Sequence, residues 1–204
     1  MLARVTHSNG SGLRSRFRQT KDQKQSPHDF AVASRPVALA GVIALVLAFS
    51  AIAFVRFGWT SRFWFLIPLF VALSTVVVLD LRLKLIPDVL TLSGIIYALA
   101  FAALIDASSF GRAVLGAIAG GGIVLLLAVI SRGAVGGGDI KLTAMLGAAL
   151  GWKGALAVLA FSHVLAAVVV LGLIIARGAG KHDGFPIGAI IAFVGAVTLV
   201  GAPP

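Results

Sequence analysis

The sequence predicts an all-α membrane protein, a polytopic helical bundle with about six to seven spans. The chain has 204 residues, of which 59% are hydrophobic and 12% are charged. Soluble domains have roughly 45–50% apolar and about 25% charged residues, so a soluble globular fold is excluded. Several apolar runs approach the roughly 17–25 residues that a helix needs to cross a bilayer. The chain has no cysteine, which excludes disulfides and thiolate metal sites.

Residues 1–35 are expected to form a basic, disordered cytoplasmic tail. This stretch contains seven Lys or Arg residues and only two Asp residues, and its apolar residues do not recur at helical spacing. The tail fits a topology signal that rests on anionic membrane lipids. A transit peptide or an upstream start is the alternative interpretation.

Seven apolar segments follow the tail: 37–54, 63–79, 89–105, 113–130, 142–150, 155–176 and 185–200. The first of them, with an external loop, makes up region 36–62, and the membrane core occupies 63–204. Segment 142–150 is too short to span comfortably unless protein buries its ends. Small residues let helix backbones approach closely. Four glycines on one segment therefore predict close helix packing there: Gly116, Gly120, Gly121 and Gly122.

The positive charges predict the orientation of the bundle. If the tail is cytoplasmic, strict alternation of the spans places 13 of the 17 basic residues on that side. The opposite orientation inverts this count, so the positive-inside rule places the N-terminus in the cytoplasm. Seven spans then place the C-terminus outside.

All the acidic residues of the chain are aspartates. Four fall at predicted cytoplasmic helix ends: Asp80, Asp88, Asp139 and Asp183. An acid at membrane depth is costly and indicates a functional site. Singly, Asp80 could pair with Arg82 or Lys84, and Asp139 could cap its helix. Together, Asp80 and Asp139 are the paired carboxyls that acid/base hydrolysis of a peptide requires.

Three glycines directly precede Asp139. Glycine permits backbone conformations and close approaches that other residues do not, so this run could let an extended substrate strand approach the carboxylate. A simple turn between helices is the alternative. A phosphate-binding loop is disfavoured, because an acid stands where the anion would bind.

Three stretches resemble motifs of the type IV prepilin peptidases: Asp80 with Ile86-Pro87-Asp88, Gly136-Gly137-Gly138-Asp139, and Phe185-Pro186-Ile187-Gly188. The second matches the family's GxGD signature. The resemblance implies a membrane-embedded aspartic endopeptidase that removes the basic leader from prepilin-like precursors, usually after a glycine. It also implies a multi-pass protein of the bacterial inner membrane that acts at the cytoplasmic face without a metal or organic cofactor.

The resemblance makes Asp80 and Asp139 the catalytic pair. The matched supporting or substrate-binding residues are Gly136, Gly138, Lys141, Pro87 and Asp88. Asp88 stands where the family commonly has Asn. With no cysteine and no large insertion, the chain resembles the short, peptidase-only form associated with Flp-type tight-adherence pili, and no N-methyltransferase activity is expected.

Two nearby carboxyls resist double ionisation and share one proton. A helix N-terminus favours a carboxylate, so the sequence favours Asp139 as base and Asp80 as acid. The competing functions are a presenilin-type intramembrane protease, a transporter and a non-enzymatic membrane subunit. Against the first, Leu79 replaces the usual tyrosine; against the second, the acids cluster at one surface. No nucleic-acid partner is expected, and the sequence does not set the oligomeric state.

Overall fold

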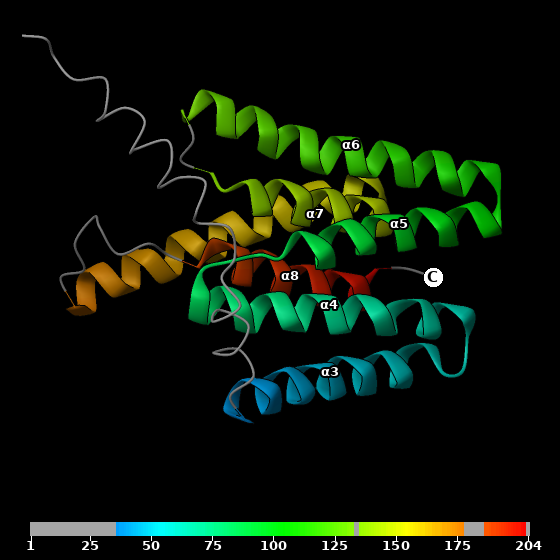
Figure 1. Ribbon diagram of the computed structural model, residues 1–204, viewed down its shortest axis with the longest axis horizontal. Coiled ribbons are helices and arrows are strands. Elements are labelled where there is room, and N and C mark those ends of the chain that lie inside the picture. The colour runs from blue at the N-terminus through cyan, green and yellow to red at the C-terminus, as the bar shows by residue number, and fades with distance from the viewer. Residues whose placement is uncertain (1–35, 133–134, 178–185, 203–204) are drawn as a thin grey trace, which may run out of the picture. The chain divides into compact units, whose positions relative to one another are not determined.

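The computed structural model describes residues 36–132, 135–177 and 186–202. Within these ranges the chain forms six α-helices and no strand (Figure 1): α3 (Pro36–Phe57), α4 (Ser61–Leu83), α5 (Asp88–Ile105), α6 (Ala107–Ile130), α7 (Gly137–Arg177) and α8 (Ile187–Gly201). Five helices are long and apolar enough to cross a membrane, and α8 is a shorter apolar helix. The predicted all-α polytopic bundle is confirmed. The predictions for residues 1–35 and for Asp183 fall outside the described residues.

Helix α7 changes direction at Gly151, whose φ of 73° and ψ of 176° are not helical. Glycine adopts a positive φ at little cost, so one residue makes the reversal. In Figure 1 the part before Gly151 and the part after it run in nearly opposite directions. We call them the short part (137–150) and the long part (152–177). The sequence predicted two separate spans here. Counting both parts, residues 36–202 contain seven helical segments in the ranges that the structure describes, and these alternate in direction (Figure 1).

The short part of α7 lies at the centre of the bundle. At about 1.5 Å per residue it is roughly 21 Å long, less than the roughly 30 Å of a bilayer's hydrocarbon core. Its side chains are nevertheless buried in protein, including Leu142, Met145 and Leu146. Gly94 of α5 faces Met145, and Gly195 of α8 faces Leu146. Protein therefore surrounds this short helix, as the sequence required.

Helices α6 and α7 pack backbone to backbone. A Cβ added to Gly116 would overlap the carbonyl oxygen of Gly147, and one added to Gly120 would overlap that of Thr143. A Cβ on Gly121 would lie 2.9 Å from the Ala144 Cβ. These three glycines make the predicted close packing. The prediction for Gly122 is wrong, because an added Cβ there meets no atom within 4 Å.

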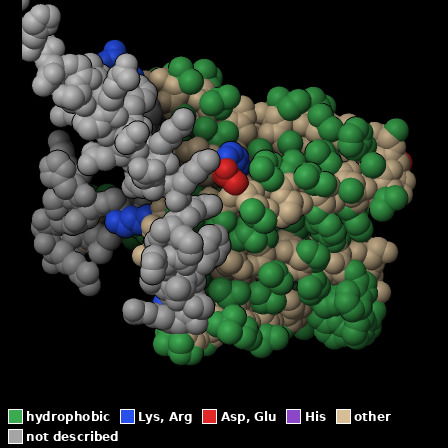
Figure 2. All heavy atoms as spheres, in the orientation of Figure 1, with side chains coloured by type: hydrophobic (Ala, Val, Ile, Leu, Met, Phe, Trp, Pro, Cys, Tyr) green, Lys and Arg blue, Asp and Glu red, His purple; other side chains and the backbone are tan. Residues whose placement is uncertain are grey.

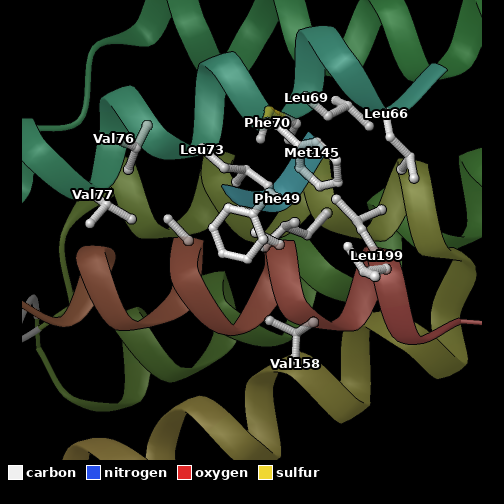
Figure 3. Packing of buried hydrophobic residues seen from close by; sticks show 14 of the residues in the cluster. Phe49, Leu66, Leu69, Phe70, Leu73, Val76, Val77, Met145, Val158 and Leu199 are labelled. Atoms are coloured by element: carbon white, nitrogen blue, oxygen red, sulfur yellow. The ribbon is translucent and has the colours of Figure 1, made fainter. Parts of the chain in front are cut away.

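The hydrophobic core lies between α4, the short part of α7 and α8 (Figure 3). Helix α4 contributes one face with helical spacing: Leu66, Leu69, Phe70, Leu73, Val76 and Val77. Phe49 of α3 stacks on Phe70 with ring centroids 5.6 Å apart. On the face drawn in Figure 2, hydrophobic side chains predominate and charged ones are few. An apolar outer surface of this kind suits contact with lipid acyl chains.

Candidate active site

Asp80 lies in the last turn of α4. The helix ends at Lys84, whose φ of 52° is left-handed and whose backbone N–H donates to the Asp80 carbonyl oxygen at 3.0 Å. The Asp80 side chain is only 6% exposed. Its Oδ2 accepts a hydrogen bond from the backbone N–H of Ala189 at 2.6 Å. This bond satisfies the buried carboxyl across 109 residues of chain and ties α4 to α8.

Ala189 is the third residue of α8, so its N–H belongs to the free donors of a helix N-terminus. Pro186 precedes the helix and has no N–H to leave unsatisfied. The Asp80 carboxyl therefore lies at the positive end of the α8 dipole. The backbone of α8 thus supplies the hydrogen-bond donor for the buried carboxyl at the end of α4.

Asp139 is the third residue of α7 and is half-buried. Its backbone N–H donates to the Gly136 carbonyl oxygen at 3.1 Å, and its carboxyl accepts a hydrogen bond from the Gly136 backbone. A third-position acid that reaches back to the residue before the helix is the geometry of a capping box. Asp139 therefore caps its helix, which the sequence offered as the alternative to a catalytic role. Its Oδ1 lies on the side of Asp80.

The two carboxyl groups meet beside Gly188. The point where a Cβ would stand on Gly188 lies 3.1 Å from Asp139 Oδ1 and 3.1 Å from Asp80 Oδ2. These two oxygens are therefore at most twice that distance apart, within reach of one bridging water. The carboxyls also interact electrostatically. Gly188 leaves the space between them free of side-chain atoms.

Ile86 closes one side of this arrangement. A Cβ on Gly138 would lie 2.8 Å from the Ile86 Cβ, and a Cβ on Gly188 would lie 2.5 Å from the Ile86 Cδ1. The connection between α4 and α5 therefore packs against the starts of both α7 and α8. Pro87 is buried next to Ile86 and precedes α5, whose Leu90 N–H donates to the Pro87 carbonyl oxygen at 3.1 Å.

Asp88 and Lys141 form an ion pair, with Asp88 Oδ2 2.7 Å from Lys141 Nζ. The pair joins the first turns of α5 and α7 and is well exposed, at 58% and 38% of the two side chains. Asp88 is the additional acid that the sequence predicted near the site, and Lys141 neutralises its charge. Within the described residues, Asp80 forms no ion pair with Arg82 or Lys84, which removes the pairing alternative for it.

The structure thus brings together four of the residues singled out from the sequence, namely Asp80, Asp139, Gly138 and Gly136. A Cβ on Gly136 would lie 3.6 Å from Asp139 Oδ2. Sequence reasoning did not find the Ala189 N–H. Its only signal was the Pro-Ile-Gly stretch before it, which predicts a helix start but not what that start faces.

Fold and site define a class: a multi-pass helical membrane protein that holds two carboxyls together at one end of its bundle. Residues 64–171 match the sequence model of the Type IV leader peptidase family. This stretch covers more than half of the chain and includes Asp80 and Asp139. The chain belongs to the Type IV leader peptidase family.

Curated relatives named prepilin leader peptidase/N-methyltransferase are similar to this chain. The protein of Aeromonas hydrophila is 35% identical over 127 residues, which is 60% of this chain and 44% of the relative. That of Myxococcus xanthus is 35% identical over 131 residues, 60% of this chain and 38% of the relative. That of Bacillus subtilis is 30% identical over 142 residues, 70% of this chain and 57% of the relative. The matched stretch thus spans about half of these relatives' length. No solved structure matches the chain.

Proposed function

We propose that this chain is an aspartic endopeptidase that removes the leader from prepilin-like precursors at the cytoplasmic face of the bacterial inner membrane. One observation carries the proposal: Asp80 and Asp139, from different helices, both approach the same point beside Gly188 at 3.1 Å. The family and the relatives' names support leader removal. Peptide hydrolysis by two carboxyls needs this arrangement, and a purely structural pair of acids does not.

In the proposed reaction, one carboxylate takes a proton from water while the other, protonated, donates to the peptide carbonyl oxygen. The water oxygen bonds to the carbonyl carbon, and the C–N bond then breaks as the leaving amine takes the proton that the first carboxylate removed from water. The second carboxyl recovers its proton from a hydroxyl of the tetrahedral intermediate as the new carboxyl group forms. One proton is shared because two close carboxyls resist double ionisation. The Asp80 carboxyl lies at the N-terminus of α8 and the Asp139 carboxyl at the N-terminus of α7, so the dipole argument made from the sequence does not separate base from acid. The proposal therefore assigns the two roles to the pair.

The test is co-expression with a prepilin-like precursor that has a basic leader and a glycine at the cleavage position. Leader removal is scored by gel shift. Asp80→Asn and Asp139→Asn should each reduce cleavage to background. Asp106→Asn, an acid in the connection between α5 and α6, serves as the matched control and should cleave normally. Substantial cleavage by either site variant would disprove the catalytic pair, and a transporter or structural subunit would then be favoured.

We propose the peptidase step alone, without methyl transfer. This activity corresponds to the short, peptidase-only form associated with Flp-type pili. The relatives' names also include N-methyltransferase. The mass of the new N-terminus of the cleaved product tests this point, because methylation adds a methyl group to it. An unmodified mass is expected, and a methylated product made by this chain alone would contradict the peptidase-only form.

The proposed orientation places the carboxyl pair on the cytoplasmic side. Because the chain has no cysteine, single cysteines report sidedness without background. Lys84→Cys should react only with a thiol reagent that reaches the cytoplasm. Ser108→Cys, at the start of α6, should react from outside. Reversed labelling would overturn the orientation.

A further inference from the structure

A cavity of about 520 Å³ opens at the end of the bundle opposite the carboxyl pair. Its floor is made by the last residues of the short part of α7 and of α8, including Leu150 and Leu199. These two helices are shorter than α4 and α6, which have 23 and 24 residues. They therefore leave a recess between the longer helices. The volume falls in the range of about 300–1,000 Å³ that is common for ligand sites.

The walls of the cavity are apolar and held in place. Phe65 and Phe101 line it, and their stacked rings have centroids 4.3 Å apart. Tyr97 stacks on Phe65 and donates its hydroxyl to the Phe65 carbonyl oxygen at 3.2 Å. A preformed wall of this kind binds an apolar chain without first having to order flexible side chains.

Two arginines, Arg62 and Arg112, lie at the rim of the cavity, and none of the described residues that line it is acidic. Arg112 donates to the hydroxyls of Ser108 and Ser109 at 3.3 and 2.8 Å. Both hydroxyls donate in turn to Asp106, at 2.6 and 3.0 Å. This network fixes the guanidinium but uses only two of its five N–H donors.

Arg62 is also fixed. Its Nη2 donates to the Ala202 carbonyl oxygen at 3.1 Å, and its guanidinium stacks 4.6 Å over the Phe57 ring. Arginine is the residue that best matches the oxygens of a phosphate. Two positioned guanidinium groups above an apolar recess fit a molecule with an anionic head and a hydrocarbon chain.

We propose that this cavity binds one anionic phospholipid from the leaflet opposite the carboxyl pair. The phosphate lies between Arg62 and Arg112, and the first part of an acyl chain lies against Phe65 and Phe101. The ends of membrane-spanning helices lie at headgroup level, so the rim meets phosphates of the bilayer directly. A free phosphate would use the arginines but leave the apolar walls empty. The lipid site goes beyond the proposed peptidase and does not depend on it.

The experiment uses the full chain in detergent with equal amounts of phosphatidylglycerol and phosphatidylcholine. Native mass spectrometry counts the phospholipid retained per protein. Wild type should retain one phosphatidylglycerol in preference to phosphatidylcholine. Arg112→Gln should reduce that retention at least about tenfold, whereas Arg132→Gln, an exposed arginine beyond the other end of α6, should not. Equal retention by Arg112→Gln and wild type would overturn the proposal.

A second variant fills the cavity and keeps both arginines. Ala149→Leu adds a side chain to the apolar lining and should also abolish retention; undiminished retention would show that no acyl chain occupies the recess, and would overturn the proposal. Thermal unfolding provides the third arm. Phosphatidylglycerol should raise the unfolding temperature of wild type more than that of Arg112→Gln. If inorganic phosphate raises it equally, the site binds a free anion and the lipid proposal fails.

Discussion

Gly188→Ala is the substitution that tests the carboxyl pair most directly. The added Cβ would stand 3.1 Å from an oxygen of Asp80 and 3.1 Å from an oxygen of Asp139, whereas ordinary contacts begin at 3.4 Å. Both carboxyls must therefore withdraw by a few tenths of an ångström, and the methyl group occupies the space between them. Ile86 Cδ1, at 2.5 Å, must move by roughly 1 Å.

The expected loss of cleavage is large. The carboxyls need to withdraw by only a few tenths of an ångström, but the methyl group takes the space between them where the proposed water would lie. Misplacing a reacting group by about 1 Å costs on the order of 100-fold in rate, or about 2.7 kcal/mol of activation free energy, and exclusion of the water should cost at least as much. The unfolding temperature should change little. Alanine favours a helix over glycine by about 1 kcal/mol, which offsets the cost of moving the flexible end of Ile86. The assays are precursor cleavage by gel shift and thermal unfolding of the purified protein.

Two variants separate the possible causes of the loss. Gly172→Ala makes the same change where an added Cβ meets no atom within 4 Å, and it should cleave within twofold of wild type. Adding Ile86→Val to Gly188→Ala removes the Cδ1 contact but leaves the methyl against the carboxyls, so cleavage should stay low. Normal cleavage by Gly188→Ala would refute the site geometry. Recovery in the double variant would assign the loss to Ile86 instead.

Three further predictions concern stability. Gly116→Ala should lower the free energy of unfolding by about 1–3 kcal/mol, because its Cβ overlaps the α7 backbone, whereas Gly122→Ala should not lower it. Hydrogen bonds, first from the Ser108 hydroxyl, lower the pKa of Asp106 from 3.8 to about 2. Its contribution is complete above pH 3.8 and is lost as the pH falls through about 2, so unfolding temperatures from pH 5 to 2 should fall less in Asp106→Asn. Asp88→Asn breaks an exposed ion pair and should change chemical-denaturation stability by less than about 1 kcal/mol.

Much of the fold follows from the sequence, because a long apolar run in a bilayer has few solutions other than a helix. The ends of the apolar runs at Leu79, Ile105 and Ile130 lie close to the observed helix ends. The reversal at Gly151 was not predicted in its observed form. A four-residue connection was expected there, and a single positive φ replaces it. Glycine permits such a φ wherever it occurs, so composition alone cannot show which glycine uses it.

The candidate site was predictable where it depends on alternation of the spans. Asp80 follows the apolar segment 63–79 and Asp139 follows the segment 113–130, so alternation of the spans places both residues at one end of the bundle. The Ala189 N–H could not be predicted, because it depends on the rotation of α8 about its own axis. The Asp88–Lys141 pair likewise depends on how α5 packs against α7. Such contacts between distant segments are set by packing, and local sequence patterns do not encode them.

The enclosed position of residues 137–150 bears on how the protein is made. A segment that inserts into the bilayer alone during synthesis must be favourable in lipid by itself. Residues 137–150 are short and begin beside a carboxylate, so they are poorly suited to insert alone. Because Gly151 joins it to the longer apolar stretch of 152–177, the two parts can enter the bilayer as a helical hairpin. The glycine face of α6 is synthesised earlier and is already in place to receive them. The order of synthesis thus makes the glycine face of α6 available before the helix that packs against it.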